Sequence, residues 1–182
     1  MSHGLVVPSH QSGPVPPALA PLARALALVN RAVLAVSMLA LVAAAAVLTY
    51  SVLTRYFFKS ATDWQDEAAV FLLVGATFLC GAYVQSYRGH IGIEAIAGLL
   101  PARIDRLRRV LVDLLTTLFC AFFTWKSWTL FHEALVEKQT SSSSWAPPLA
   151  IPYGLMAAGM TLLTVQVLLQ LAAELMVARS RR

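Results

Sequence analysis

The sequence predicts an all-α integral membrane protein with four transmembrane helices, short interfacial helices and both termini in the cytoplasm. Hydrophobic residues make up 58% of the 182 positions and charged residues only 13%, whereas charged residues reach roughly a quarter of a typical soluble domain. Four apolar stretches are long enough to cross a bilayer, and the Lys and Arg residues between them alternate in abundance. We expect helices because a helix satisfies its own backbone hydrogen-bonding groups in lipid.

The four predicted spans belong to one transmembrane domain, which covers residues 24–178 and precedes a basic tail at 179–182. The spans cover residues 32–54, 68–87, 107–130 and 149–176. The first two are uncharged and exceed the roughly 18 residues that a membrane helix needs. The third is the least regular, because Asp113 and Lys126 lie inside it. The fourth holds no charge before Glu174 and is long enough that we expect it to tilt or protrude.

Residues 1–23 are expected to form a disordered leader, because they contain five prolines and no periodic apolar face. A cleaved signal peptide is the competing interpretation, but its apolar region has only about 7 to 15 residues. The 23-residue first span fits a retained helix better. Leucines between Pro21 and Arg31 predict a further short helix lying in the cytoplasmic interface.

The distribution of basic residues predicts the orientation. Ten of the 14 Lys and Arg residues lie before the first span, between the second and third, or after the fourth. Since basic residues are retained in the cytoplasm during insertion, both termini should be cytoplasmic. The same distribution accounts for the net charge of +5, so no nucleic-acid partner is predicted.

The connections between spans are short and differ in character. The first, at 55–67, mixes aromatic and charged residues, as is typical of an outer membrane boundary. The second alternates apolar and polar residues and predicts an interfacial helix before Pro101. The third, at 139–148, has four consecutive serines and two prolines and predicts a flexible outer loop.

Few residues suggest chemistry, and no catalytic, cofactor or metal site is predicted. His90 and His132 fall on opposite sides of the predicted membrane, which disfavours paired haem ligation. Asp113 lies four residues after Arg109. It therefore fits a structural ion pair, a contact with a partner subunit, or a role in ion or proton translocation.

Residues suited to helix packing recur at four-residue spacing. Small pairs are found in the second and fourth spans, at Ala76 and Cys80, Thr77 and Gly81, and Gly154 and Ala158. Gln166 and Gln170 also share one face of the fourth helix. Small residues allow close backbone approach, and an amide in hydrocarbon gains from a hydrogen-bond partner. Both features fit either packing within the chain or docking of a partner.

Several motifs, in order, resemble those of one family. Arg55-Tyr56-Phe57-Phe58 ends the first span, and Trp64-Gln65-Asp66-Glu67 begins the next helix. Next come Gly81 and the stretch from Arg88 to Glu94, which contains a Gly-His-Ile sequence. The later motifs are Leu99-Leu100-Pro101, Thr140-Ser141 and Ile151-Pro152-Tyr153. Over about residues 24–178 the chain resembles the small membrane subunit of tripartite ATP-independent periplasmic (TRAP) transporters. It departs from the family pattern at Ala157-Ala158-Gly159, where members often have a second proline.

The resemblance implies a subunit of the bacterial inner membrane that binds no substrate itself. In that family a large multi-span subunit carries the substrate and sodium sites, and a periplasmic binding protein delivers an organic acid. The small subunit scaffolds the large one, which suits a rigid bundle with few buried polar groups. Two alternatives remain open: a stand-alone four-helix exporter acting as a homodimer, and a membrane enzyme or electron-transfer subunit.

The candidate contact residues have proposed roles. Trp64 would anchor the outer interface, and Asp66 and Glu67 would cap the start of the second helix, where the helix dipole favours negative charge. Simple interfacial anchoring without a subunit contact is the competing interpretation. Arg88 and His90 would dock the large subunit or bind anionic membrane lipids.

Overall fold

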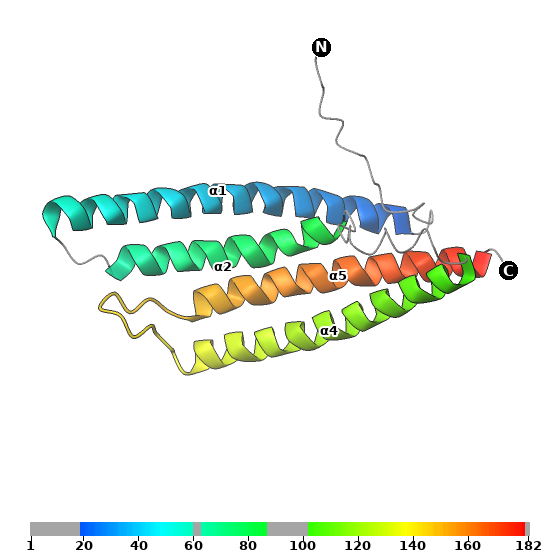
Figure 1. Ribbon diagram of the computed structural model, residues 1–182. Helices are drawn as coiled ribbons and strands as arrows, with labels where there is room; N and C mark the ends of the chain where they lie inside the picture. The colour runs from blue at the N-terminus through cyan, green and yellow to red at the C-terminus, as the bar shows by residue number, and fades with distance from the viewer. Residues whose placement is uncertain (1–18, 60–62, 87–101, 181–182) are drawn as a thin grey trace, which may run out of the picture.

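The computed structural model describes residues 19–59, 63–86 and 102–180. They form the helices α1 (Ala20–Phe58), α2 (Asp63–Ser86), α4 (Ala102–Val136) and α5 (Ala150–Ser180) (Figure 1). Each contains a segment long and apolar enough to cross a membrane. The predicted all-α fold with four membrane-spanning helices is confirmed. The interfacial helix expected before Pro101 lies outside the described residues.

The first helix is longer than its predicted span. α1 has 39 residues, or about 58 Å at 1.5 Å per residue, against a hydrocarbon core of about 30 Å. It begins at Ala20, inside the segment expected to be a disordered leader. The expected interfacial helix between Pro21 and Arg31 is therefore not separate but the first turns of α1. Pro21 is tolerated there because amides in a first turn have no helical acceptor.

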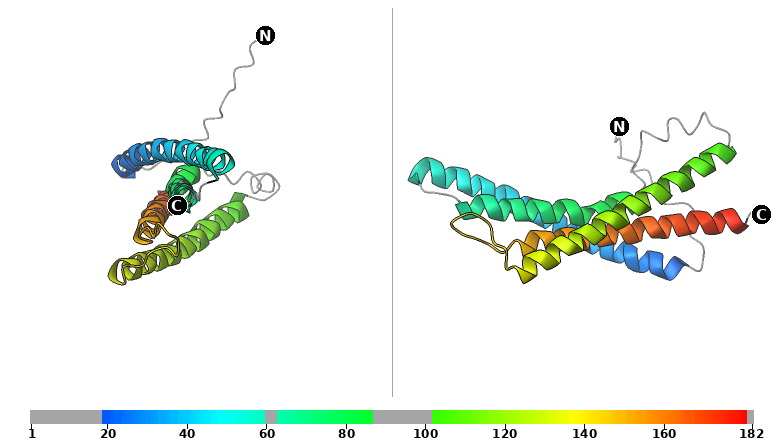
Figure 2. Two further views of the ribbon diagram at one scale, coloured as in Figure 1. Left: turned by 90° about the vertical axis from the view of Figure 1, so that its left-hand side faces the viewer. Right: turned by 90° about the horizontal axis from the view of Figure 1, so that it is seen from below.

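The helices stand in a row in the order α1, α2, α5, α4. The main packing contacts join α1 to α2, α2 to α5, and α5 to α4. Figure 2 shows α1 and α4 on opposite sides of the central α2 and α5 pair. The arrangement is a layer, so each outer helix keeps one face away from the other described helices. α1 begins and α5 ends at the same end of the molecule (Figure 1).

Each outer helix packs through small or polar residues seven positions apart. The buried residues on these seams are Asn30, Ser37, Ala44 and Ser51 on α1 and Asp113, Cys120, Ser127 and Ala134 on α4. A seven-residue repeat keeps one face of a helix against its neighbour, as in coiled coils. Because the side chains are short, the helix backbones can lie close together.

The central contact between α2 and α5 depends on a glycine. A Cβ atom at Gly159 would lie 2.4 Å from the carbonyl oxygen of Phe78. Gly75 lies against Leu155 in the same interface, and Val167 of α5 is completely buried. Of the predicted small pairs, Ala76 is buried, whereas Thr77 and Ala158 are exposed. Gly154 instead packs against the ring of Phe131 on α4.

Candidate functional site

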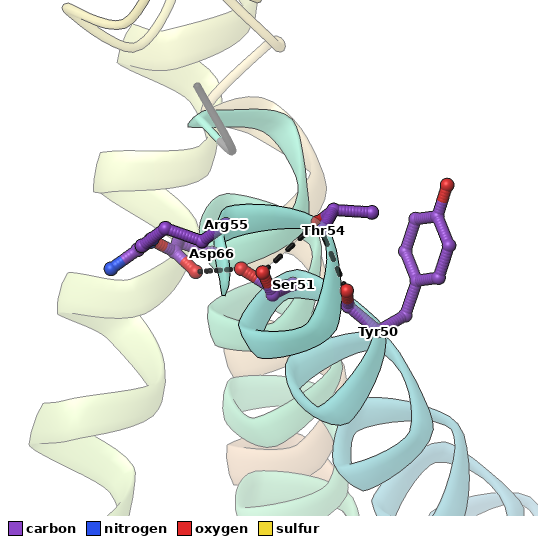
Figure 3. Close-up of polar contacts among 5 residues, drawn as sticks. All are labelled: Tyr50, Ser51, Thr54, Arg55 and Asp66. Carbon is purple, nitrogen blue, oxygen red and sulfur yellow. Dashed lines mark hydrogen bonds and ion pairs between the residues drawn. The ribbon is translucent and has the colours of Figure 1, made fainter. Parts of the chain in front are cut away.

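The first turns of α2 carry Trp64, Asp66 and Glu67, and Asp66 connects them to α1. The Asp66 carboxylate accepts a hydrogen bond from Ser51 Oγ at 3.2 Å and forms an ion pair with Arg55 Nη2 at 3.1 Å. Figure 3 shows Ser51 and Arg55 on α1 beside Asp66. One carboxylate therefore fixes the end of α1 to the start of α2.

Glu67 makes the corresponding connection in the other direction along the layer. Its carboxylate accepts hydrogen bonds from the hydroxyls of Ser141 and Ser143, the latter at 2.7 Å. Both serines belong to the connection between α4 and α5, where the backbone amide of Ser141 also donates to the Pro147 carbonyl at 3.0 Å. The predicted loop is present, and two of its four serines bind Glu67.

The adjacent carboxylates thus join three parts of the chain. Both lie near the start of α2, where the helix dipole favours negative charge, but the contacts seen for their side chains are to neighbouring segments. Trp64 is 45% exposed, as an interfacial anchor would be. Asp66 therefore ties α2 to α1, and Glu67 ties α2 to the α4–α5 connection.

Replacing Glu67 with alanine should release the α4–α5 connection. Hydrogen bonds to a charged acceptor contribute about 1.5–3 kcal/mol when well formed. Glu67 is only half-buried, so we expect amide hydrogen exchange at residues 139–148 to accelerate by about tenfold. Glu133→Ala is the matched control, since its carboxylate is exposed at the same end of the molecule. Equal exchange in the two variants would contradict the role given to Glu67.

Amide side chains form a second group, at the end where α1 begins. Asn30 Nδ2 of α1 donates to Gln166 Oε1 of α5 at 3.1 Å. Gln85 Nε2 of α2 donates to Gln170 Oε1 at 3.0 Å, and Gln170 Nε2 returns a bond to the Gln85 carbonyl at 2.9 Å. Both predicted glutamines are therefore buried and bonded within the chain.

Asn30 and Gln85 are hydrogen-bond partners of the two glutamines that were not predicted from the sequence. Each is a single amide near the end of an apolar segment. That position was the only sequence signal for their hydrogen bonds to other helices.

Side-chain hydroxyls make similar links between α4 and α5. Thr124 and Thr164 lie 2.8 Å apart through their hydroxyl oxygens, and Trp128 Nε1 donates to Thr161 at 3.0 Å.

Asp113 is 9% exposed and lies on the α4 seam. The hydroxyl of Thr117 donates to its backbone carbonyl at 2.6 Å. The side chain of Arg109 is outside the described part of the chain, so the Asp113–Arg109 ion pair stays a prediction. Arg88 and His90 also lie outside the described residues.

The polar side chains described above connect segments of the chain to one another. Within residues 19–59, 63–86 and 102–180, no group of three or more His, Cys, Asp or Glu side chains is placed to hold a metal ion. The amides and carboxylates described above instead connect one helix, or one loop, to another. Such contacts hold the four helices in a fixed order.

Comparison with known proteins agrees with the resemblance seen in the sequence. Residues 44–176 match the DctQ component of tripartite ATP-independent periplasmic transporters. The chain is 26% identical over 134 residues to the isethionate TRAP transporter permease protein DctMQ of Oleidesulfovibrio alaskensis, a match that covers 70% of this chain and 21% of the relative. No solved structure matches. The chain therefore belongs to the DctQ family of TRAP transporter components, as a multi-pass inner-membrane protein that is not an enzyme.

Proposed function

We propose that this chain is the small permease subunit of a TRAP-type secondary transporter and scaffolds the large membrane subunit. The transporter would take up an organic acid, driven by sodium and delivered by a periplasmic binding protein. The name of the relative combines an M and a Q component, and the chain covers only 21% of that protein. This supports a partner that supplies the rest of such a permease.

The observation that carries the proposal is the internal pairing of the buried amides. Asn30 of α1 pairs with Gln166 of α5, and Gln85 of α2 pairs with Gln170 of α5. Interhelical hydrogen bonds in membranes stabilise packing by about 0.6–2 kcal/mol each. Polar groups used in this way brace the helices, so the mobile, solute-binding part is assigned to the partner.

We assign the end with the Asp66 and Glu67 ties to the periplasm, because the basic residues favour the cytoplasm for both termini. Ser142→Cys should then react with a membrane-impermeant maleimide in intact cells, because Ser142 is exposed. Ser180→Cys, at the end of α5, should react only after the cells are opened. Both variants are made in a background without Cys80 and Cys120. The reverse labelling pattern would overturn the orientation.

Co-purification and transport test the proposed function directly. Tagged protein isolated in mild detergent should recover a large multi-span partner, and deletion of this chain should abolish organic-acid uptake. Recovery of no partner together with unchanged uptake would overturn the proposal. Solute transport by the purified chain alone, lost in Asp113→Asn, would support the exporter instead.

For Arg88 and His90 we propose contact with the large subunit or with anionic lipid headgroups on the cytoplasmic side. His90→Ala should lower recovery of the large subunit if the histidine docks it. Unchanged recovery would remove His90 from the interface.

A further inference from the structure

The outward face of α4 combines large apolar side chains with one cation. Leu115, Phe119, Phe122 and Lys126 are exposed and recur at three- or four-residue spacing, so they share one side of the helix. The buried seam that contains Cys120 lies on the opposite side. Leu115, Thr116, Leu118, Phe119 and Phe122 line a shallow groove of about 780 Å³ on this face. The face therefore points away from the other helices.

Lys126 lies inside the membrane-spanning segment Val110–Val136. Its Nζ lies 5.1 Å from the centre of the Trp125 ring, a cation–π contact. Among the described residues, no carboxylate lies within ion-pair distance of this ammonium group. Because a charged side chain facing lipid is unfavourable, Lys126 needs an anionic partner other than the described residues of this chain.

The direction of the helix disfavours a headgroup as that anion. Lys126 is ten residues from the end of the apolar segment Val110–Val136 and 16 residues from its start. The nearer membrane surface is therefore on the C-terminal side, whereas side chains on a helix lean toward its N-terminus. The lean of the side chain therefore disfavours contact between the ammonium group and the nearer headgroups.

The outward face of α1 provides the internal comparison. It too is exposed and apolar, but its large side chains along the middle of the helix are aliphatic, including Leu39 at 71% and Val42 at 68% exposure. An aliphatic face of this kind is suited to contact with the acyl chains of lipids. On α4, Phe119, Phe122 and Trp125 are 62%, 51% and 64% exposed, and aromatic residues are enriched at protein interfaces. The two outer helices therefore differ in the surroundings that they fit.

We infer that the outward face of α4 docks the large membrane subunit, and that Lys126 pairs with a carboxylate on one of its transmembrane helices. This inference rests on the proposed function and specifies the docking surface. The charge of Lys126 favours a partner that supplies a carboxylate. The aromatic side chains beside it favour a protein helix as that partner. The face of α1 is left to lipid.

Site-specific photocrosslinking tests which face is covered. A photoreactive phenylalanine analogue at Phe122 should crosslink to the large subunit in membranes, whereas the same analogue at Leu39 should crosslink to lipid only. A large-subunit crosslink from Leu39 and not from Phe122 would overturn the inference. So would a crosslink from Phe122 only to lipid, or only to a second copy of this chain.

Substitution of Lys126 tests the charge. Lys126→Met retains length and packing and should lower recovery of the large subunit by about tenfold or more, since loss of one partner from a desolvated pair is costly. Lys126→Arg should restore recovery, and an acid-to-lysine change in the large subunit should rescue Lys126→Glu. If the wild-type chain recovers its partner but Lys126→Met does so equally, the charge pair is refuted while the proposed function stands. If the wild-type chain recovers no partner, the proposed function itself fails.

Discussion

Gly159→Ala is expected to push α2 and α5 apart and to destabilise the whole helix layer. The new Cβ would lie 2.4 Å from the carbonyl oxygen of Phe78 and 2.5 Å from its carbonyl carbon. These are backbone atoms within a helix, so a side-chain rotation cannot relieve the contact. Overpacking of this kind costs about 1–3 kcal/mol. The effect should be among the largest for a single methyl group, because this contact joins the α1–α2 half to the α4–α5 half.

Thermal unfolding of the purified protein in mild detergent measures the effect. Gly81→Ala is the matched control on α2, since its Cβ would lie 4.0 Å from Leu163, an ordinary contact distance. That control should be neutral or slightly stabilising, because alanine favours a helix over glycine by about 0.5–1 kcal/mol. Equal unfolding midpoints for the two variants would show that α2 and α5 are not in close contact at Gly159.

The sequence was sufficient to predict the number and the approximate positions of the helices. Long uncharged stretches need a helix in lipid, so the first and second spans were identified from composition alone. The helix ends were harder to predict. α1 begins at Ala20 and α4 continues to Val136, because charged and polar residues that leave the hydrocarbon can continue a helix in water. A hydropathy boundary marks the membrane, not the end of the helix.

The order of the helices could not be read from small pairs four residues apart. Such pairs are common in membrane helices, and Thr77 and Ala158 turned out to be exposed. The informative signal was a longer repeat: small or polar residues at every seventh position of α1, from Asn30 through Ser37 to Ser51. A repeat sustained over several turns defines one face, whereas a single pair does not.

The candidate site was predicted in part. The acidic start of α2 was recognised as important, but Ser141 and Ser143 are 74 and 76 residues away from Glu67 along the chain. No local pattern encodes that contact. It exists because α2 and α5 lie side by side, which brings the connection before α5 to the start of α2.

The run Ala43–Ala46 on α1 allows a prediction with controls in adjacent residues. Only Ala44 is buried, at 1% exposure, while its neighbours Ala43 and Ala45 are exposed. Ala44→Leu should therefore overpack the seam with α2 and lower stability by about 1–3 kcal/mol. Because α1 contacts the layer mainly through this one seam, the added side chain displaces the helix instead of being absorbed by repacking around it.

Ala43→Leu and Ala45→Leu add the same atoms to the exposed side of α1 and should leave the unfolding midpoint nearly unchanged. The comparison removes hydrophobicity, helix propensity and size as explanations, since the three variants differ only in the direction of one side chain. If Ala44→Leu unfolds at the same temperature as the other two, α1 does not pack on α2 through the Asn30 to Ser51 repeat. If instead Ala45→Leu alone is destabilised, the repeat must be displaced by one residue, and the face of α1 assigned to lipid would have to be reassigned with it.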